Sequence, residues 1–257
     1  MITLTINNVK YKAPQDWSEI TLKKFIALCG IEIPEKLRLL WKASAGGNDK
    51  EYALVNDSIG VTELEKVFPV YYGHVITCLT TVPQDVVDMM HTALREQLFN
   101  KYLRHYVYST FANMPLHLVN GDLEVYEPAA VKSFKVGGVE YMLPETLSVY
   151  GSDIPMGREQ VITFAEASDI EIALRNMAEG AADRLPMFVA IYCRPKGEKY
   201  NEQAVIQRAA ALNTLPMSTV WAVFFCIYRL LQKYQTSTQR FLEKVVVTAA
   251  GKLSKAG

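Results

Sequence analysis

The chain contains 257 residues, and its 27 Lys and Arg are balanced by 27 Asp and Glu. Half of the residues are hydrophobic, a composition typical of folded globular proteins that excludes intrinsic disorder of the whole chain. Because the net charge is zero, the sequence lacks the basic field with which nucleic-acid-binding proteins neutralise phosphates. We therefore expect no specific nucleic-acid partner.

The first 14 residues predict a β-hairpin. Hydrophobic and polar residues alternate over 2–6, Asn7-Asn8 supplies a two-residue turn, and the alternation resumes at residue 9 until Pro14 ends it.

Helices are predicted from there to about residue 112. Apolar residues at helical spacing indicate a helix over 22–29, and Pro34 starts a second one. Thr62 and Glu65 have the spacing of a capping box at the start of a third. The longest helix is expected to begin behind Pro83 and to continue for as many as seven turns.

A second small sheet is predicted after residue 115. Asn120-Gly121 and Gly137-Gly138 are two-residue turn pairs between short alternating runs. Helices then resume, one of them capped by Asn201 and another begun by Pro216.

The second hairpin repeats the first at an offset of 130 residues. Leu4, Ile6, Val9, Tyr11 and Pro14 are matched by Phe134, Val136, Val139, Tyr141 and Pro144. Beyond the hairpins, residues 22–28 align with 161–167. A chance likeness of two hairpins and an internal duplication are the two interpretations, and the match favours duplication.

We therefore predict an α+β protein that is predominantly helical. It consists of two tandem modules, 1–115 and 116–257, each with an N-terminal β-hairpin followed by helices. The hairpins have edge strands that must be covered or used for pairing with another chain.

The sequence contains no signature of catalysis or metal binding. It has no HExxH, no GxSxG, no Walker phosphate loop and no Cys-x-x-Cys pair. We expect no enzyme, and hence no catalytic residue, no cofactor and no metal. The four cysteines are far apart in the sequence and are expected to be buried, reduced thiols: Cys29, Cys78, Cys193 and Cys226.

The most apolar stretch, 217–231, is too short to cross a bilayer and contains Arg229, so we expect a core helix and no membrane partner. With no export signal recognised, we expect the chain to work or be assembled in a cytoplasm. The last 22 residues carry four basic and one acidic residue. A solvated helix end is favoured for this tail over a phosphate-binding arm.

Aromatic residues and one polar loop supply the candidate contact sites. Tyrosines of the long helix fit either the core or an interface, because tyrosine buries a large area and keeps a polar end. The loop 193–200 lies between two apolar helices and fits either a contact or a solvated loop. The candidate partner-contact residues are Tyr102, Tyr106, Arg194, Pro195 and Tyr200. For Trp221, Phe224 and Phe225 we favour the core.

Two stretches resemble virion morphogenesis proteins of tailed bacteriophages. The first is "ITLTINNVKYKAPQDWSEITLKKFIAL", in which a hairpin, a proline, a Trp and an Ile-Thr step lead into a helix. The second is "LPMFVAIYCRPKGEKYNEQAVIQRAAALNTLPMSTVWAVFF", with an Arg-Pro, a Gly-Glu, a tyrosine, an Arg-Ala and a Leu-Pro before an aromatic helix. The resemblance implies a tail, baseplate or head-to-tail connector component or a tail assembly chaperone, without discriminating among them.

From this resemblance we expect a non-enzymatic structural subunit that acts through protein-protein interfaces. Its partners would be other phage structural proteins and further copies of itself, and its location the virion, after assembly in the host cytoplasm. A transient tail assembly chaperone is the first alternative. A regulatory binding module outside the virion is the second.

Overall fold

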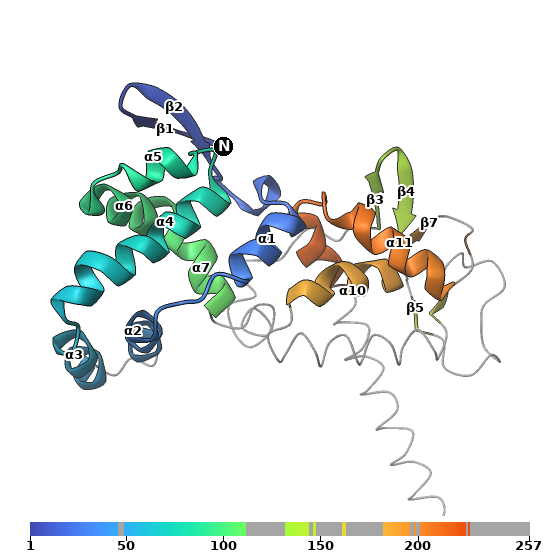
Figure 1. Ribbon diagram of the computed structural model, residues 1–257. Helices are drawn as coiled ribbons and strands as arrows, with labels where there is room; N and C mark the ends of the chain where they lie inside the picture. The colour runs from blue at the N-terminus through green and yellow to red at the C-terminus, as the bar shows by residue number, and fades with distance from the viewer. Residues whose placement is uncertain are drawn as a thin grey trace, which may run out of the picture. The chain divides into compact units, whose positions relative to one another are not determined.

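The computed structural model describes residues 1–45, 49–111, 132–143, 146–147, 161–162, 182–195, 198, 201–224 and 226. Over these residues the protein is α+β and predominantly helical, which confirms the predicted fold class (Figure 1). The chain divides into two compact units. Unit 1 comprises Met1–Glu127, Ala178–Asp183 and Asn213–Ser218, and unit 2 comprises Pro128–Met177, Arg184–Leu212 and Thr219–Gly257. Two short segments of the C-terminal half therefore belong to unit 1.

Unit 1 consists of a hairpin followed by helices. Its elements are β1 (Ile2–Ile6), β2 (Val9–Ala13), the 3₁₀ turn η1 (Trp17–Glu19), α1 (Leu22–Cys29), α2 (Glu35–Ala45), α3 (Asp49–Asp57), the π-helical turn η2 (Glu63–Val67), α4 (Phe68–Leu79), α5 (Gln84–Asp88), α6 (Thr92–Leu98), the π-helical turn η3 (Phe99–Leu103) and α7 (Arg104–Phe111).

The first hairpin forms as predicted and projects from the helices of unit 1 (Figure 1). Its antiparallel register pairs Ile2 with Ala13 and Ile6 with Val9, so the turn is Asn7-Asn8. Both turn residues have positive φ, 51° and 63°, as the two-residue type I′ turn requires. The alternation buries Leu4, Ile6 and Ala13 on one face of the hairpin.

Asn8→Gly is expected to stabilise unit 1 by about 0.5 kcal/mol, because Asn-Gly is the preferred pair for a type I′ turn. Asn8 has φ 63°, a conformation that costs an L-residue energy but costs glycine none. Urea denaturation measures the change. Asn8→Ala is the matched control and is expected to shift the midpoint in the opposite direction, and equal shifts for both variants would contradict the assignment of the turn.

The segment Asn213–Ser218 completes unit 1 by pairing with the chain that leads into α1. The backbone N–H of Leu22 donates to the carbonyl of Leu215 at 2.7 Å, and that of Met217 donates to the carbonyl of Ile20 at 2.7 Å. Leu215 and Met217 are buried. Residues that are almost 200 positions apart in the sequence thus share one core.

The helix that ends as α4 starts differently from the prediction. Thr62 is already helical and its side chain caps no backbone group, so the predicted capping box is wrong. The carboxylate of Glu63 instead accepts from the backbone N–H of Gly60 at 3.1 Å. This bond is the reciprocal half of a capping box displaced by two residues, with Gly60 at the cap.

The predicted long helix is interrupted. It begins behind Pro83 as expected, but α5 ends at Asp88, and α6 starts only after His91. His91 has an extended backbone, and its imidazole Nδ1 accepts from the N–H of Ala93 at 3.3 Å, which caps α6. The prediction of one continuous helix is therefore wrong. The apolar residues keep their helical spacing through this region, but the His91 side chain caps the start of a separate helix.

Unit 2 also combines a hairpin with helices. Its described elements are β3 (Ser133–Val136), β4 (Val139–Met142), β5 (Thr146–Leu147), β6 (Val161–Ile162), α10 (Leu185–Tyr192), β7 (Arg194–Pro195) and α11 (Glu202–Leu212). A 3₁₀ turn, η5 (Ala182–Arg184), precedes α10, and a further helix, 217–224, begins within the segment Asn213–Ser218. Strands β3, β4 and β7 form one antiparallel sheet, and β5 pairs with β6 in parallel.

Aromatic residues fill the core of unit 2. Phe188 lies 5.3 Å from Tyr192 and 5.5 Å from Phe224, measured between ring centroids. Trp221 and Phe224 are buried, which confirms the core prediction for both. Phe225 lies outside the described residues.

The two hairpins have the same register and the same kind of turn. Leu4 faces Tyr11 in the first, and Phe134 faces Tyr141 in the second, where Gly137-Gly138 forms the turn with φ 56° and 82°. The predicted turn at Asn120-Gly121 lies outside the described residues. The predicted alignment of 22–28 with 161–167 fails at its start, because Leu22 begins a helix while the β-branched Val161-Ile162 forms strand β6.

The likeness extends to what each hairpin pairs with. In unit 1, Lys12 exchanges hydrogen bonds with Thr81, two residues after the buried helix α4 ends. In unit 2, Met142, at the position equivalent to Lys12, pairs with Arg194, two residues after the buried helix α10 ends. Both helices carry Pro in their first turn. This shared arrangement supports an internal duplication.

Candidate functional site

The loop between α10 and α11 contains three of the predicted contact residues. Arg194 and Pro195 form β7 and pair with Met142 and Tyr141 of β4. Arg194 is buried, and its guanidinium donates to the carbonyl of Glu198 at 3.5 Å. Pro195 is half-buried, and Tyr200 lies outside the described residues. The Arg194 side chain thus contributes to the structure of the loop itself, and partner contact by Pro195 and Tyr200 stays a prediction.

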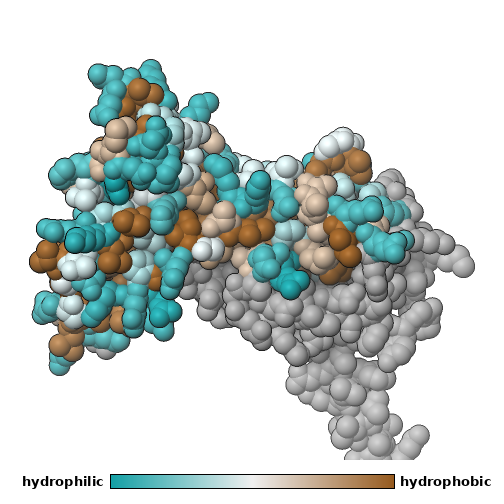
Figure 2. Space-filling view, in the orientation of Figure 1, coloured by the Kyte–Doolittle hydropathy of each residue, from teal (hydrophilic) through white to brown (hydrophobic). Residues whose placement is uncertain are grey.

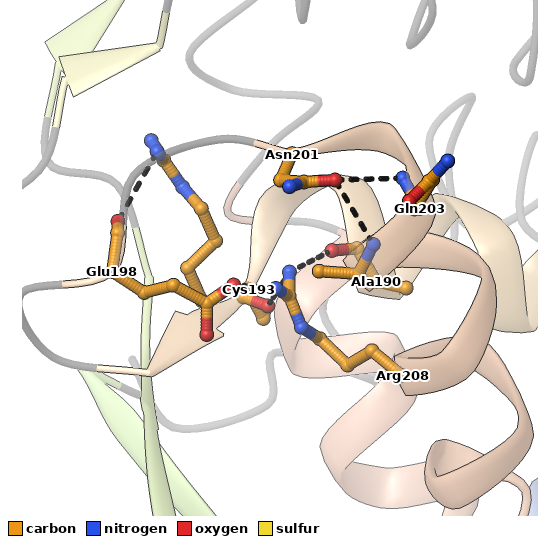
Figure 3. A network of polar contacts seen from close by, with 8 residues as sticks. Ala190, Cys193, Glu198, Asn201, Gln203 and Arg208 are labelled. Atoms are coloured by element: carbon orange, nitrogen blue, oxygen red, sulfur yellow. Dashed lines mark hydrogen bonds and ion pairs between the residues drawn. The ribbon is translucent and has the colours of Figure 1, made fainter.

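Arg208 of α11 holds this loop in place. Its guanidinium Nη1 donates to the carbonyl of Ala190 at 2.8 Å and to that of Cys193 at 3.3 Å, both at the end of α10. Nη2 forms an ion pair with the carboxylate of Glu198 (Figure 3). The side chain of Arg208 is only 4% exposed, whereas that of Glu198 is 34% exposed. A buried cation therefore binds the carbonyl end of one helix and fixes the loop that leaves it.

Asn201 starts α11, as the sequence predicts. Its side-chain oxygen accepts from the backbone N–H of Gln203 at 2.9 Å and of Ala204 at 3.3 Å (Figure 3). The pairing of β7 with β4 therefore holds the beginning of the loop, and the Asn201 cap of α11 holds its end. In its described part Arg194 is buried, whereas Glu198 and Asn201 are exposed.

The two candidate tyrosines of unit 1 lie in different environments. Tyr106 in α7 is fully buried and contacts Trp17 edge-to-face, with ring centroids 4.9 Å apart. Tyr106 therefore takes the core role, which the sequence left open. Tyr102 in η3 is half-buried, and the Lys101 ammonium lies 5.1 Å from its ring centroid. Partner contact by Tyr102 stays a prediction.

An exposed hydrophobic surface lies elsewhere on unit 1. None of the side chains of α3 is buried. Leu54 of α3 is 73% exposed, and Val61, which starts the next helix, is 67% exposed. Figure 2 shows hydrophobic surface over α3 and the first turns of the following helix. We call four exposed residues of this stretch the α3 patch: Tyr52, Leu54, Val61 and Leu64.

The α3 patch was missed by the sequence reasoning. Residues 49–57 mix apolar and charged residues without a strong one-sided pattern, so the sequence alone does not single them out. The signal that the sequence does contain is a series of large apolar residues among charged ones, which are Tyr52, Leu54, Val61 and Leu64. Exposed apolar surface of this kind marks interaction sites more often than scattered single residues do.

Acidic residues surround the α3 patch. The stretch 49–66 contains five acidic residues and two basic ones: Asp49, Glu51, Asp57, Glu63 and Glu65 against Lys50 and Lys66. Most of these side chains are exposed. The patch therefore combines exposed hydrophobic area with net negative charge.

The thiols are free but differ in burial. Cys193 is buried, whereas Cys29, Cys78 and Cys226 are half-buried, so the prediction of four buried thiols holds fully only for Cys193. Burial, together with the neighbouring Cys78, raises the pKa of Cys29 to about 12. Burial likewise raises the pKa of Cys193. Thiols with raised pKa values are weak nucleophiles at neutral pH, because the thiolate is the reactive form.

Unit 1 is expected to lose stability as the pH rises above 9. The unfolded thiol of Cys29 ionises near pH 9, whereas in the folded state its pKa is about 12, so the folded state retains a proton that the unfolded state releases. Stability is therefore fully present below pH 9 and declines above it, by roughly 1 kcal/mol at pH 10. Burial also raises the pKa of Tyr72, to about 12, which adds a loss above pH 10.

Urea denaturation at pH 8, 9 and 10 measures this decline, and Cys29→Ala is the control. Because the alanine has no proton to release, the variant is expected to lose the part of the pH dependence between 8 and 10 that Cys29 contributes. The part that remains is expected to come from Cys78, whose pKa burial also raises. A slope that is unchanged in Cys29→Ala would show that another group is responsible.

Within the described ranges, no three His, Cys, Asp or Glu side chains come together closely enough to hold a metal ion. Among the described helices, none is both long and apolar enough to cross a membrane.

Comparisons with protein-family models, with curated proteins and with solved structures gave no match to this chain.

Proposed function

We propose that this chain is a non-enzymatic assembly protein of tailed-phage particles, a structural subunit of the tail, the baseplate or the head-to-tail connector. The phage context rests on the sequence resemblance described above. The observation that carries the mode of action is the α3 patch, since it exposes large apolar side chains on a unit that has a complete aromatic core of its own.

The aromatic residues of unit 1 support this distinction between core and surface. Tyr72 stacks on Phe99 with ring centroids 4.4 Å apart, and Trp41 stacks on Phe99 at 6.4 Å. These rings are buried together. The apolar residues of the α3 patch lie outside this core, and their exposure supports a surface that contacts another protein.

The polar chemistry of the described residues also supports a binding role. Arg208, the most buried charged residue of the described part, binds the carbonyl end of α10 and the carboxylate of Glu198. Burial raises the pKa values of the half-buried thiols Cys29 and Cys78, and the Cys78 thiol donates to the carbonyl of Lys24. The groups described here thus have structural roles and support action through surfaces.

Light scattering over a concentration series tests the proposal, together with mass spectrometry of purified particles from a phage that encodes this chain. The expected results are a specific oligomer in solution and the presence of the chain in mature particles at a fixed copy number. A strict monomer that is absent from particles would contradict a structural subunit and would favour the transient chaperone or the binding module.

A further inference from the structure

Resting on this proposed function, we infer that the basic C-terminal segment of one copy, residues 236–257, docks on the α3 patch of a second copy. The contact would be heterologous, because the two surfaces that meet are different parts of the chain. Such contacts repeat from copy to copy and build closed rings or open filaments.

The α3 patch provides the receiving surface. Its apolar residues belong to two consecutive helices joined by the short link Ser58–Gly60. Leu54 and Val61, on either side of this link, are the most exposed of them. The surrounding stretch 49–66 has an excess of three acidic residues over basic ones. An occupant must therefore offer apolar side chains and positive charge together.

The C-terminal segment has this chemistry. Its four basic residues are Arg240, Lys244, Lys252 and Lys255, and its single acidic residue is Glu243. Its apolar residues include Leu242, Val246, Ala249 and Leu253, at spacings of three and four that are typical of an amphipathic helix. The excess of three basic residues equals the excess of three acidic residues in the stretch 49–66.

Electrostatic attraction and apolar burial would act together in this contact. Opposite charges guide association and fix the orientation, while the apolar side chains provide most of the affinity. Because the charged groups of the α3 patch are exposed, the affinity is expected to fall as the salt concentration rises.

Two variants of the full-length protein test the inference by complementation. Leu54→Lys removes the most exposed apolar residue of the α3 patch and adds a positive charge. The double variant Arg240→Glu and Lys244→Glu reverses the charge of the C-terminal segment. Each variant alone retains one intact surface and is expected to be a monomer by light scattering. A 1:1 mixture is expected to form a dimer and nothing larger, because the free ends of that dimer carry the disabled surfaces.

Met89→Lys is the matched control for the first variant. Met89 is 76% exposed on unit 1, lies outside the α3 patch and receives the same new side chain. A synthetic peptide of residues 236–257 is expected to bind the tail-reversed double variant at least tenfold more tightly than the same protein that also carries Leu54→Lys. Adding Met89→Lys instead is expected to change this affinity by less than twofold.

The outcomes separate this inference from the proposed function. If wild-type protein forms oligomers that Leu54→Lys leaves intact, or if the 1:1 mixture stays monomeric, the inferred contact is wrong while the assembly role stands. Equal peptide affinity with and without Leu54→Lys also overturns the contact. If wild-type protein is monomeric and absent from particles, the assembly role fails, and the peptide titration still decides whether the two surfaces bind.

Discussion

A fragment of residues 1–127 is expected to be far less stable than unit 1 in the complete chain, although it holds nearly all of that unit. The fragment lacks Asn213–Ser218, whose Leu215 and Met217 are buried in unit 1. Removal of one buried Leu or Met side chain typically costs about 2–5 kcal/mol. Since a whole domain is stable by about 5–15 kcal/mol, loss of both is expected to leave the fragment largely unfolded.

Backbone hydrogen bonds add to this loss. In the fragment, the N–H groups of Leu22 and Lys23 lose the carbonyls of Leu215 and Asn213, to which they donate at 2.7 and 3.0 Å. These are the first residues of α1, where backbone N–H groups have no partner within the helix. The missing segment therefore both fills the core and satisfies the start of a helix.

Circular dichroism and urea denaturation of the fragment measure the effect. In the full-length chain, Leu215→Ala and Met217→Ala are expected each to lower the stability of unit 1 by about 2–5 kcal/mol. Met89→Ala is the matched control, because Met89 is 76% exposed on unit 1 and its truncation is expected to change stability by less than about 0.5 kcal/mol. A fragment that unfolds at the same urea concentration as unit 1 would contradict the role assigned to the segment.

This segment also shows why part of the fold could not be predicted from the sequence. Both hairpins were predicted with the right turns, because Asn7-Asn8 and Gly137-Gly138 fix the turn through their own backbone preferences. The pairing of Leu215 with Leu22 has no local signal, since nothing in either stretch identifies its distant partner. The residues of a segment predict its own helices, strands and turns, whereas pairing between segments far apart in the sequence is seen only in the structure.

The prediction of helix boundaries failed for a related reason. The apolar periodicity from residue 84 onward continues through Met89–His91, so it predicts one helix. The imidazole of His91 starts a new helix there, although histidine is not among the preferred capping residues. In the same way, Thr62 matches a capping pattern, while Gly60 and Glu63 make the actual bond.

The candidate contact residues divide according to burial, which residue type alone does not determine. Tyr106, predicted from the frequency of tyrosine in interfaces, and Arg194, predicted from its place in a polar loop, are both buried in their own units. The α3 patch, in contrast, consists of ordinary apolar residues such as Leu54, whose significance depends entirely on being exposed. A sequence shows which side chains are hydrophobic, but only the packing of the helices shows which of them remain uncovered.

Arg208→Met is expected to lower the stability of unit 2 by about 3 kcal/mol, because breaking a buried, hydrogen-bonded ion pair is strongly destabilising. The variant leaves the carbonyls of Ala190 and Cys193 without the donor they now have, and it leaves the Glu198 carboxylate without its cation. Glu198 is 34% exposed and can reach water, so the loss is expected at the lower end of the range for buried pairs. Hydrogen exchange in α10 and α11, measured by mass spectrometry, reports on unit 2 separately from unit 1.

Three further variants locate the source of the effect. Gln207→Met places the same side chain at the neighbouring, exposed position and is expected to leave exchange unchanged. Glu198→Gln keeps an oxygen acceptor for Arg208 and is expected to cost less than about 1 kcal/mol, since the carboxylate is partly solvated. Arg208→Lys keeps the charge but loses the planar group that reaches both helix carbonyls and Glu198 at once, so it is expected to behave more like Arg208→Met than like wild type. Equal exchange in Arg208→Met and Gln207→Met would show that packing of the arginine stem, and not its three polar contacts, holds the loop.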